Sequence, residues 1–327
     1  MQMQFIREAS PDPGRRRLLV RALYITILGN AVLAVGKGIV AAISGSVALY
    51  ADAANSVSDL FYSLLISLGL WISQRPPDLS HPQGHSRFEP LAGLVVAAAM
   101  TIAAYEAGRA AVERFLAGGT TVSLGWPAAA LLVSAALKSV MYVLIHRIAG
   151  QASSPTLDAA AKDNFADVLT SIAAFAGILA SQFLHPLADP IAGAAVALWI
   201  LHAALGVWGE NLRYLTGGGA SSELRQEIIA VSGAVQGVER VHQVITEHVG
   251  PELVADLHIN VDGNLPLFDA HAISDNVRES VEALEGIDRA YVHVEPCEII
   301  PRLDDRGPAG SEPPEGGGAG ERAAQKR

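Results

Sequence analysis

Two pairs of polar side chains lie four residues apart in segments that are otherwise apolar enough to cross a membrane. Asn55 and Asp59 lie in "SVALYADAANSVSDLFYS", and Asp163 and Asp167 lie in "SPTLDAAAKDNFADVLTS". Residues four apart share one face of a helix, so each pair would direct its oxygen atoms the same way. Carboxylates are costly at membrane depth and by default indicate a function there. Two such helices could offer four oxygen-bearing side chains to one cation; the alternative is a structural role in helix–helix hydrogen bonds or water-filled helix ends.

The composition restricts the class of protein. The chain has 327 residues, of which 50% are hydrophobic and 17% charged, and its mean hydropathy is +0.31. Such values indicate a membrane protein. A net charge of −10 argues against a nucleic-acid partner, and one cysteine excludes a disulfide framework or a multi-cysteine zinc site. The chain contains no GxxxxGK[ST] and no hydrolase signature such as HExxH or GxSxG, so we expect neither nucleotide use nor an enzyme.

Six apolar segments are long enough to cross a bilayer, which takes about 20 helical residues. Arginines gather before the first segment and in the loops that follow the second and the fourth. The positive-inside rule therefore places both termini in the cytoplasm. From the compactness and composition of the chain, we expect it in a bacterial inner (cytoplasmic) membrane. We expect residues 1–214 to form this domain, with spans at 18–42, 47–73, 91–113, 124–148, 160–184 and 187–212.

The remainder of the chain has the pattern of a small α+β domain. Residues 215–300 read as helix, strand, strand, helix and strand, with alternating apolar residues in the strands and helical spacing in the helices. Residues 301–327 are rich in Gly, Pro and charge, and we expect them to be disordered. The predicted fold is therefore an α-helical membrane protein of six transmembrane helices followed by a cytosolic αββαβ domain.

Further ligand-type side chains lie outside the spans. Asp78, His81 and His85 fall within eight residues of the loop "PDLSHPQGHSRFE" and could wrap one metal ion; alternatively, "HPxGH" only fixes the loop. In the C-terminal domain, His293 and Glu295 are two apart on one predicted strand and therefore share a face.

These motifs together resemble the cation diffusion facilitator family of divalent-metal/proton antiporters, of the bacterial iron, zinc and manganese efflux type. The resemblance rests on "SGSVALYADAANSVSD", "RPPDLSHPQGHSRFEPLAGL", "DNFADVLTS" and the histidine pattern of the C-terminal domain, and it runs from about residue 15 to 300. It implies six spans, a cytosolic ferredoxin-like domain, a homodimer in the lipid bilayer, and export by alternating access. It also implies three metal sites: a transport site of Asn55, Asp59, Asp163 and Asp167, a loop site of Asp78, His81 and His85, and a cytosolic site of His242, His258, His271, His293 and Glu295. His248 is a further candidate ligand, and Asp52 is given no ligand role.

The side chains of the first site favour one group of metals. Imidazole suits zinc, copper and nickel, whereas carboxylate and carbonyl oxygens suit harder ions such as manganese. The resembling zinc transporters place His in this site, and here there is none, so Mn²⁺ is favoured, with Zn²⁺, Fe²⁺, Co²⁺ and Ni²⁺ as alternatives. Repulsion among buried carboxylates favours their protonated form when the site is empty, and a metal needs them ionised, so exchange with protons is expected.

Two other interpretations of these features are possible besides a metal transporter. The spans could merely anchor a metal sensor or scaffold whose cytosolic domain binds metal without transport. An intramembrane metallohydrolase is a third reading, which no catalytic motif supports. The buried carboxylates discriminate, because a mere anchor has no reason to bury them.

Overall fold

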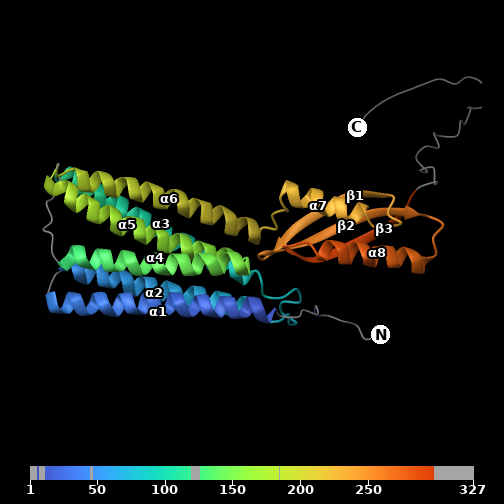
Figure 1. Cartoon of the computed structure of the whole chain (residues 1–327), viewed down its shortest axis with the longest axis horizontal. Helices are drawn as coiled ribbons and strands as arrows, with labels where there is room; N and C mark the ends of the chain where they lie inside the picture. The colour runs from blue at the N-terminus through green and yellow to red at the C-terminus, as the bar shows by residue number, and fades with distance from the viewer. Residues whose placement is uncertain (1–5, 7–11, 45–46, 119–125, 184, 298–327) are drawn as a thin grey trace, which may run out of the picture.

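A computed structural model describes residues 6, 12–44, 47–118, 126–183 and 185–297. For a few residues within the helices, Asn55 among them, only the backbone is described. The chain forms a long bundle of helices with a smaller sheet-and-helix domain beyond one end of it (Figure 1). The tail predicted at 301–327 lies outside the described residues.

The bundle contains six long helices, as the hydropathy pattern predicted. At a rise of about 1.5 Å per residue, helices of this size are roughly 40 to 48 Å long and exceed the hydrocarbon core of about 30 Å. They are α1 (Pro13–Ser44), α2 (Val47–Ser73), α3 (Phe88–Leu116), α4 (Trp126–Ala152), α5 (Pro155–Phe183) and α6 (Ala188–Leu215).

The outer surface of the bundle is apolar. Within the described residues, five helices carry an apolar stretch of membrane-spanning length. The sixth, α5, has its apolar sequence interrupted by charged residues, as expected for a helix that faces the interior of the bundle. Large hydrophobic side chains on several helices are more than half exposed, which suits contact with lipid. They include Leu28, Val32, Phe61, Leu68, Leu198 and Leu205.

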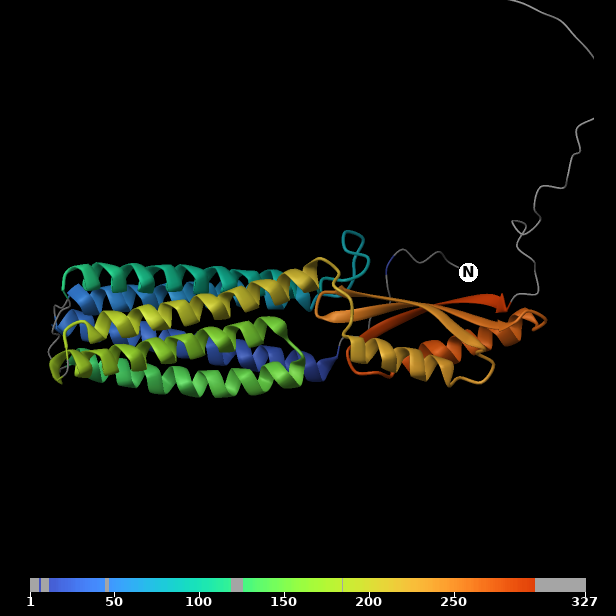
Figure 2. The same cartoon turned by 90° about the horizontal axis from the view of Figure 1, so that it is seen from above.

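Helices that follow one another do not all lie side by side. The most extensive packing joins α3 to α6, α4 to α5, and α1 to α2, and Figure 2 shows α3 running beside α6. Small residues allow close approach, as is usual in membrane bundles. A Cβ on Gly93 of α3 would overlap the side-chain amide of Asn211 on α6, so a larger residue there would require Asn211 to move.

The turn between α4 and α5 is shorter than the interval between the predicted spans at 124–148 and 160–184. Helix α4 continues to Ala152, Ser153 adopts φ of 46°, and α5 begins at Pro155. The Ser154 backbone N–H donates to the Ala149 carbonyl at 3.1 Å, and its hydroxyl accepts from the Leu157 N–H at 3.3 Å. These bonds satisfy groups at both helix ends, so the helices can extend beyond the apolar part of the sequence.

The C-terminal domain has the predicted αββαβ order. Its strands β1 (Arg240–Val249) and β2 (Glu252–Asp262) form an antiparallel hairpin, and β3 (Ile287–Cys297) pairs with β2 in parallel. The central strand is therefore β2. The helices are α7 (Ser222–Gly233) and α8 (Leu267–Glu282), and the Ser221 hydroxyl caps α7 by accepting from the Leu224 N–H.

The two helices of this domain leave one face of the sheet uncovered. Figure 2 shows α7 and α8 on the same side of the strands. Ala255, Leu257 and Ile259 are fully buried in the core that the helices form with the sheet. Side chains alternate along a strand, so His258 and its neighbours in register point to the opposite face.

The loop after α2 contacts the C-terminal domain. The Ser86 hydroxyl donates to the Val249 carbonyl at 2.9 Å, and a Cβ on Gly250 would lie 2.6 Å from the Ser86 backbone. The covalent connection runs through Gly217, which has φ of 72°. The loop and the β1–β2 hairpin are therefore held together where the bundle meets the domain.

Candidate metal sites

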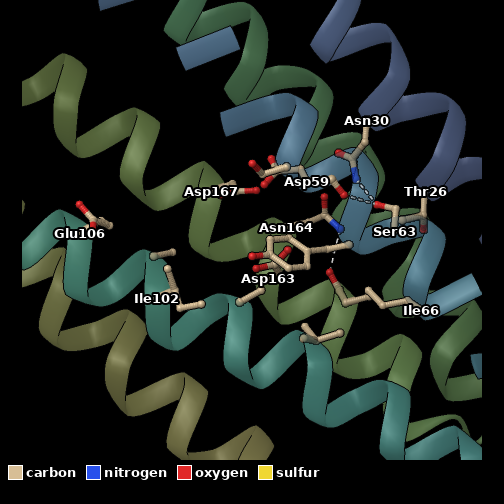
Figure 3. A pocket seen from close by; sticks show the side chains of 16 residues that line it. Thr26, Asn30, Asp59, Ser63, Ile66, Ile102, Glu106, Asp163, Asn164 and Asp167 are labelled. Carbon is tan, nitrogen blue, oxygen red and sulfur yellow. Dashed lines mark hydrogen bonds between the residues drawn. The ribbon is translucent and has the colours of Figure 1, made fainter. Parts of the chain in front are cut away.

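The carboxylates of the predicted transport site line one cavity in the middle of the bundle (Figure 3). The cavity has a volume of about 180 Å³ and is walled by α1, α2, α3 and α5. Asp59 comes from α2, and Asp163 and Asp167 come from α5, one turn apart on the same face. The predicted convergence of the two helices is thus present for these three side chains.

The fourth predicted ligand is described only in part. Asn55 lies one turn before Asp59 on α2, which is the spacing that puts both on one face, but its side chain is outside the description. Its role as a ligand stays a prediction. The side chain of Asp52, which is given no ligand role, is also outside the description.

The oxygen atoms of the intramembrane carboxylates are farther apart than the ligand atoms of a closed coordination shell would be. Among the described His, Cys, Asp and Glu side chains, sets of three with ligand atoms within 4.8 Å of one another occur at the loop and in the C-terminal domain. Asp59, Asp163 and Asp167 do not form such a set. Their arrangement is an open polar cavity into which a cation could draw the two helices together.

Two amide oxygens add to the acceptors around this cavity. Asn30 donates to the Ser63 hydroxyl at 2.6 Å, and Asn164 donates to the Ala160 carbonyl at 2.7 Å. Their own Oδ1 atoms are buried and accept no hydrogen bond from the described part of the chain. Both residues line the cavity, so its chemistry is that of oxygen ligands.

A buried cation that was not predicted from the sequence accompanies these acids. Lys138 of α4 places Nζ 2.6 Å from Oδ2 of Asp167 and 3.3 Å from Oδ2 of Asp59. Its side chain is only 4% exposed. The signal was present in "LLVSAALKSVMYVL", because a lone lysine in a membrane span needs an acidic partner.

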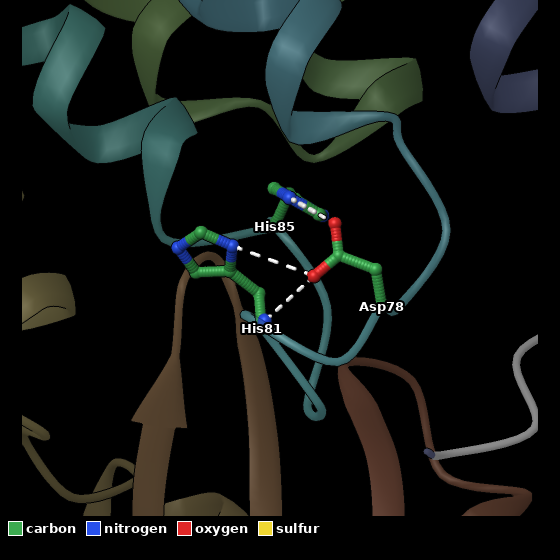
Figure 4. Close-up of side chains that lie close together, drawn as sticks. All are labelled: Asp78, His81 and His85. Atoms are coloured by element: carbon green, nitrogen blue, oxygen red, sulfur yellow. Dashed lines mark hydrogen bonds and ion pairs between the residues drawn. The ribbon is translucent and has the colours of Figure 1, made fainter.

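The loop residues converge as predicted (Figure 4). Asp78 places Oδ1 3.7 Å from Nδ1 of His81 and Oδ2 3.5 Å from Nε2 of His85. A backbone hydrogen bond from His81 is the main reason why the pKa of the Asp78 carboxyl lies below its usual range. An ionised carboxylate beside two imidazoles is a suitable set of ligands for a transition metal.

The same loop also has the internal bonds that a purely structural role requires. The His81 carbonyl accepts from the N–H of Asp78 at 3.2 Å and of Gly84 at 2.9 Å. Gly84 has φ of 102°, which favours glycine. His85 is 6% exposed, and its Nδ1 accepts or donates no hydrogen bond within the described residues. The geometry is therefore compatible with both alternatives.

In the C-terminal domain, a cluster forms on the uncovered face of the sheet. Nδ1 of His258 lies 3.0 Å from Oε1 of Glu295, and Nε2 of His242 lies 3.4 Å from its Oε2. His293 is opposite His258 in register, with ring centroids 4.8 Å apart. The hydrogen bond with His258, followed by the charges of the histidines, lowers the pKa of Glu295. His242, His258 and Glu295 have ligand atoms close enough to share one ion.

Two predicted ligands lie away from this cluster. His271, at the start of α8, is in the helix layer and pairs with Asp275 at 3.5 Å. His242 is two residues after Arg240, which is opposite Asn260, and so lies on the open face. The register shift between Val241 and Gln243 gives the residues after it the opposite alternation. His248 is therefore buried at the other face, 4.6 Å from the ring of Tyr214 at the end of α6.

A six-helix membrane bundle with carboxylates around a central cavity, joined to a domain with a metal-ligand face, is the architecture of a membrane transporter for metal cations. The sequence matches two family descriptions: "Cation efflux transmembrane domain" over residues 23–216 and "Cation efflux protein, cytoplasmic domain" over residues 220–297. The chain belongs to this cation efflux family, the cation diffusion facilitators, whose members are transporters of divalent metal cations rather than enzymes.

Relatives match over most of their own length. An uncharacterized transporter of Methanocaldococcus jannaschii is 33% identical over 279 residues, which cover 85% of this chain and 99% of the relative. The manganese efflux system protein MneS of Bacillus subtilis is 31% identical over 280 residues, 84% of this chain and 94% of the relative. The magnetosome protein MamB of Magnetospirillum gryphiswaldense is 28% identical over 246 residues, 75% of this chain and 83% of the relative.

Proposed function

We propose that this protein exports Mn²⁺ in preference to other divalent cations across the cytoplasmic membrane, in exchange for protons. The observation that carries the proposal is the central cavity, which is lined by the carboxylates of Asp59, Asp163, Asp167 and Glu106 and by amide and hydroxyl oxygens. No histidine or cysteine is among the described residues that line it. Such a set of ligands suits hard ions such as manganese better than zinc. The likeness to a manganese efflux protein supports the same metal.

Proton exchange follows from the chemistry of these side chains. Ionised carboxylates that share a poorly solvated cavity repel one another, and a divalent cation relieves that repulsion. In its absence, protons do so, and metal binding must release them. The protein then needs no nucleotide, because the proton gradient supplies the free energy of export.

Alternating access requires contacts at both ends of the bundle that can open in turn. At the end nearer the C-terminal domain, Arg15 pairs with the buried Glu89 at 2.8 Å. At the far end, Arg114 of α3 pairs with the buried Asp189 of α6 at 3.0 Å. We propose these ion pairs as closures of the two ends, with both termini in the cytoplasm.

For the C-terminal domain, we propose homodimerisation and binding of regulatory metal on the uncovered face. One chain brings three or four ligands together there, while His271 lies elsewhere. An incomplete set in one protomer is consistent with completion by a second copy.

The test is uptake of Mn²⁺ and Zn²⁺ into vesicles that contain the purified protein and an imposed proton gradient. Asp163→Ala should abolish Mn²⁺ flux, because it removes a carboxylate from the cavity. Asp158→Ala is the matched control: Asp158 is on the same helix but pairs with Lys162 at 2.7 Å and does not line the cavity. Mn²⁺ flux that persists in Asp163→Ala, or that survives collapse of the gradient, would contradict the proposal.

If no flux of either metal occurs while the C-terminal domain still binds metal, the result favours the alternative that the protein is a membrane-anchored metal sensor or scaffold.

A further inference from the structure

Lys138 is the one charged residue of α4 that the structure buries in the centre of the described bundle, at 3% exposure. Its neighbours in sequence are apolar or small. A charge at this depth is tolerated only with a partner. The ammonium has two, Asp167 at 2.6 Å and Asp59 at 3.3 Å, which belong to different helices.

The ammonium lies behind the carboxylates and does not line the cavity. The cavity is lined by residues of α1, α2, α3 and α5, and α4 contributes none among those described. The side chain of Lys138 is 4% exposed, whereas those of Asp59 and Asp167 are 21% and 32% exposed. Lysine thus holds the Oδ2 atom of each carboxylate from the enclosed side, while the carboxylates border the cavity.

This arrangement fixes the charge that a cation meets in the cavity. With Asp59, Asp163 and Asp167 ionised, these acids contribute three negative charges and Lys138 contributes one positive charge. Glu106 also lines the cavity, but its charge is balanced by Arg109 at 3.0 Å. The resulting net charge of −2 is neutralised by a single divalent cation. Without the lysine, the loaded site would keep an excess negative charge, which is costly where solvation is poor.

We propose that Lys138 is the fixed counter-charge of the transport site and limits its affinity for a divalent cation, so that the bound ion can leave. The inference rests on the proposed transport function and names a residue that tunes it. Lys138 is a positioning and charge-setting residue, since it acts on the ion through Asp59 and Asp167. Binding that is too tight would slow release and therefore the transport cycle.

The first experiment measures equilibrium binding of Mn²⁺ to the full-length protein in detergent at about pH 8, from the free Mn²⁺ concentration. Binding that disappears in Asp163→Ala is assigned to the cavity, which separates it from the loop and C-terminal sites. In Lys138→Met, we expect the affinity of the cavity to rise by about tenfold or more, because a charge of like sign to the ion is gone. Lys138→Arg keeps the charge and should stay within about threefold of wild type.

A charge-compensated pair protects the test against misfolding of Lys138→Met. Asp59→Asn alone leaves one net negative charge and should weaken Mn²⁺ binding. Adding Lys138→Met to Asp59→Asn restores two negative charges and should strengthen binding again by about tenfold relative to Asp59→Asn. A merely structural lysine predicts the reverse, since its loss would remove the brace between α2 and α5.

The rate of Mn²⁺ transport provides a second, independent measurement. Lys138→Met should bind Mn²⁺ more tightly but take it up more slowly at saturating Mn²⁺, because release limits the cycle. Unchanged or weaker binding in both lysine-free variants would overturn the inference. Failure of wild type to transport any metal would overturn the proposed function instead, and the binding comparison would still decide the role of Lys138.

Discussion

Arg15 and Glu89 join the start of α1 to the start of α3 by an ion pair of 2.8 Å, and the Glu89 side chain is fully buried. The same carboxylate accepts from the Ser154 hydroxyl at 2.5 Å, and the Glu89 carbonyl accepts from the Thr156 hydroxyl at 2.5 Å. Arg15 also donates to the Ala152 carbonyl at 2.9 Å. One acidic residue therefore ties three parts of the bundle together at the end nearer the C-terminal domain.

Loss of this acid should destabilise the bundle. Glu89→Ala removes the carboxylate that pairs with Arg15 and accepts from the Ser154 hydroxyl, and breaking a buried pair costs about 3 to 5 kcal/mol. Glu89→Gln keeps an acceptor for Ser154 and should cost less. In thermal unfolding of the detergent-solubilised protein, the melting temperature should fall in the order wild type, Glu89→Gln, Glu89→Ala. Equal melting temperatures for all three would show that the contact contributes nothing to stability.

Close packing of α3 on α6 gives a second prediction. Gly93→Ala places a methyl group against Asn211, and overpacking of this kind costs about 1 to 3 kcal/mol. Gly209→Ala is the matched control on α6, because its Cβ would meet nothing within 4 Å. The control should be neutral or slightly stabilising in the same unfolding assay, since alanine favours helix. A Gly93→Ala protein as stable as the control would contradict close packing of the two helices at Gly93.

The contact between the bundle and the C-terminal domain should weaken in acid. Burial, followed by the charge of Arg213, lowers the pKa of His248. The folded state therefore favours the neutral imidazole, and the contribution of His248 to stability is present above the pKa of an unfolded histidine, about 6.5, and is lost as pH falls below it. Amide hydrogen exchange across 213–220 should quicken as pH falls from about 7 to 5, after correction for the intrinsic rate.

His248→Phe retains an aromatic ring beside Tyr214 but cannot gain a proton. In that variant, the corrected exchange rate should not depend on pH. If the variant shows the same acid-induced loosening as wild type, another group is responsible.

The number of metal ions bound per chain tests the loop site. If Asp78, His81 and His85 bind metal, His85→Ala should remove one equivalent of Zn²⁺ per chain, with the other sites unaffected. Arg75→Ala is a control in the same loop: its guanidinium stacks on Trp71 at 4.1 Å and is not one of the three. Unchanged stoichiometry in His85→Ala would leave the loop with only its structural role, in which His81 and Gly84 close the turn.

The local periodicity of the sequence was sufficient to predict much of the fold. Apolar segments of span length and alternating strands predicted all the helices and strands, and the i, i+4 spacing predicted that Asp163 and Asp167 share a face. Helix ends were less accurate, because polar contacts such as those of Ser154 extend α4 and α5 beyond their apolar residues.

Relationships between distant segments were harder to predict. The β-bulge after Val241 changes which residues of β1 face the cluster, and nothing in the local sequence indicates it. Lys138 was overlooked because its partners lie on α2 and α5, so its role appears only when three helices are assembled. The position of His271 follows from α8 lying on the opposite side of the sheet from the cluster.

The most direct test of the central claim, an oxygen-lined cavity that selects manganese, is competitive uptake of Mn²⁺ and Zn²⁺ by wild type and Asn55→His in proton-loaded vesicles. Asn55 lies one turn from Asp59, so the variant would add an imidazole to the carboxylates. We predict that wild type takes up Mn²⁺ in preference and that Asn55→His shifts the ratio towards Zn²⁺ by about tenfold or more. Uptake of Zn²⁺ without Mn²⁺ by wild type, or a ratio that Asn55→His leaves unchanged, would contradict the claim.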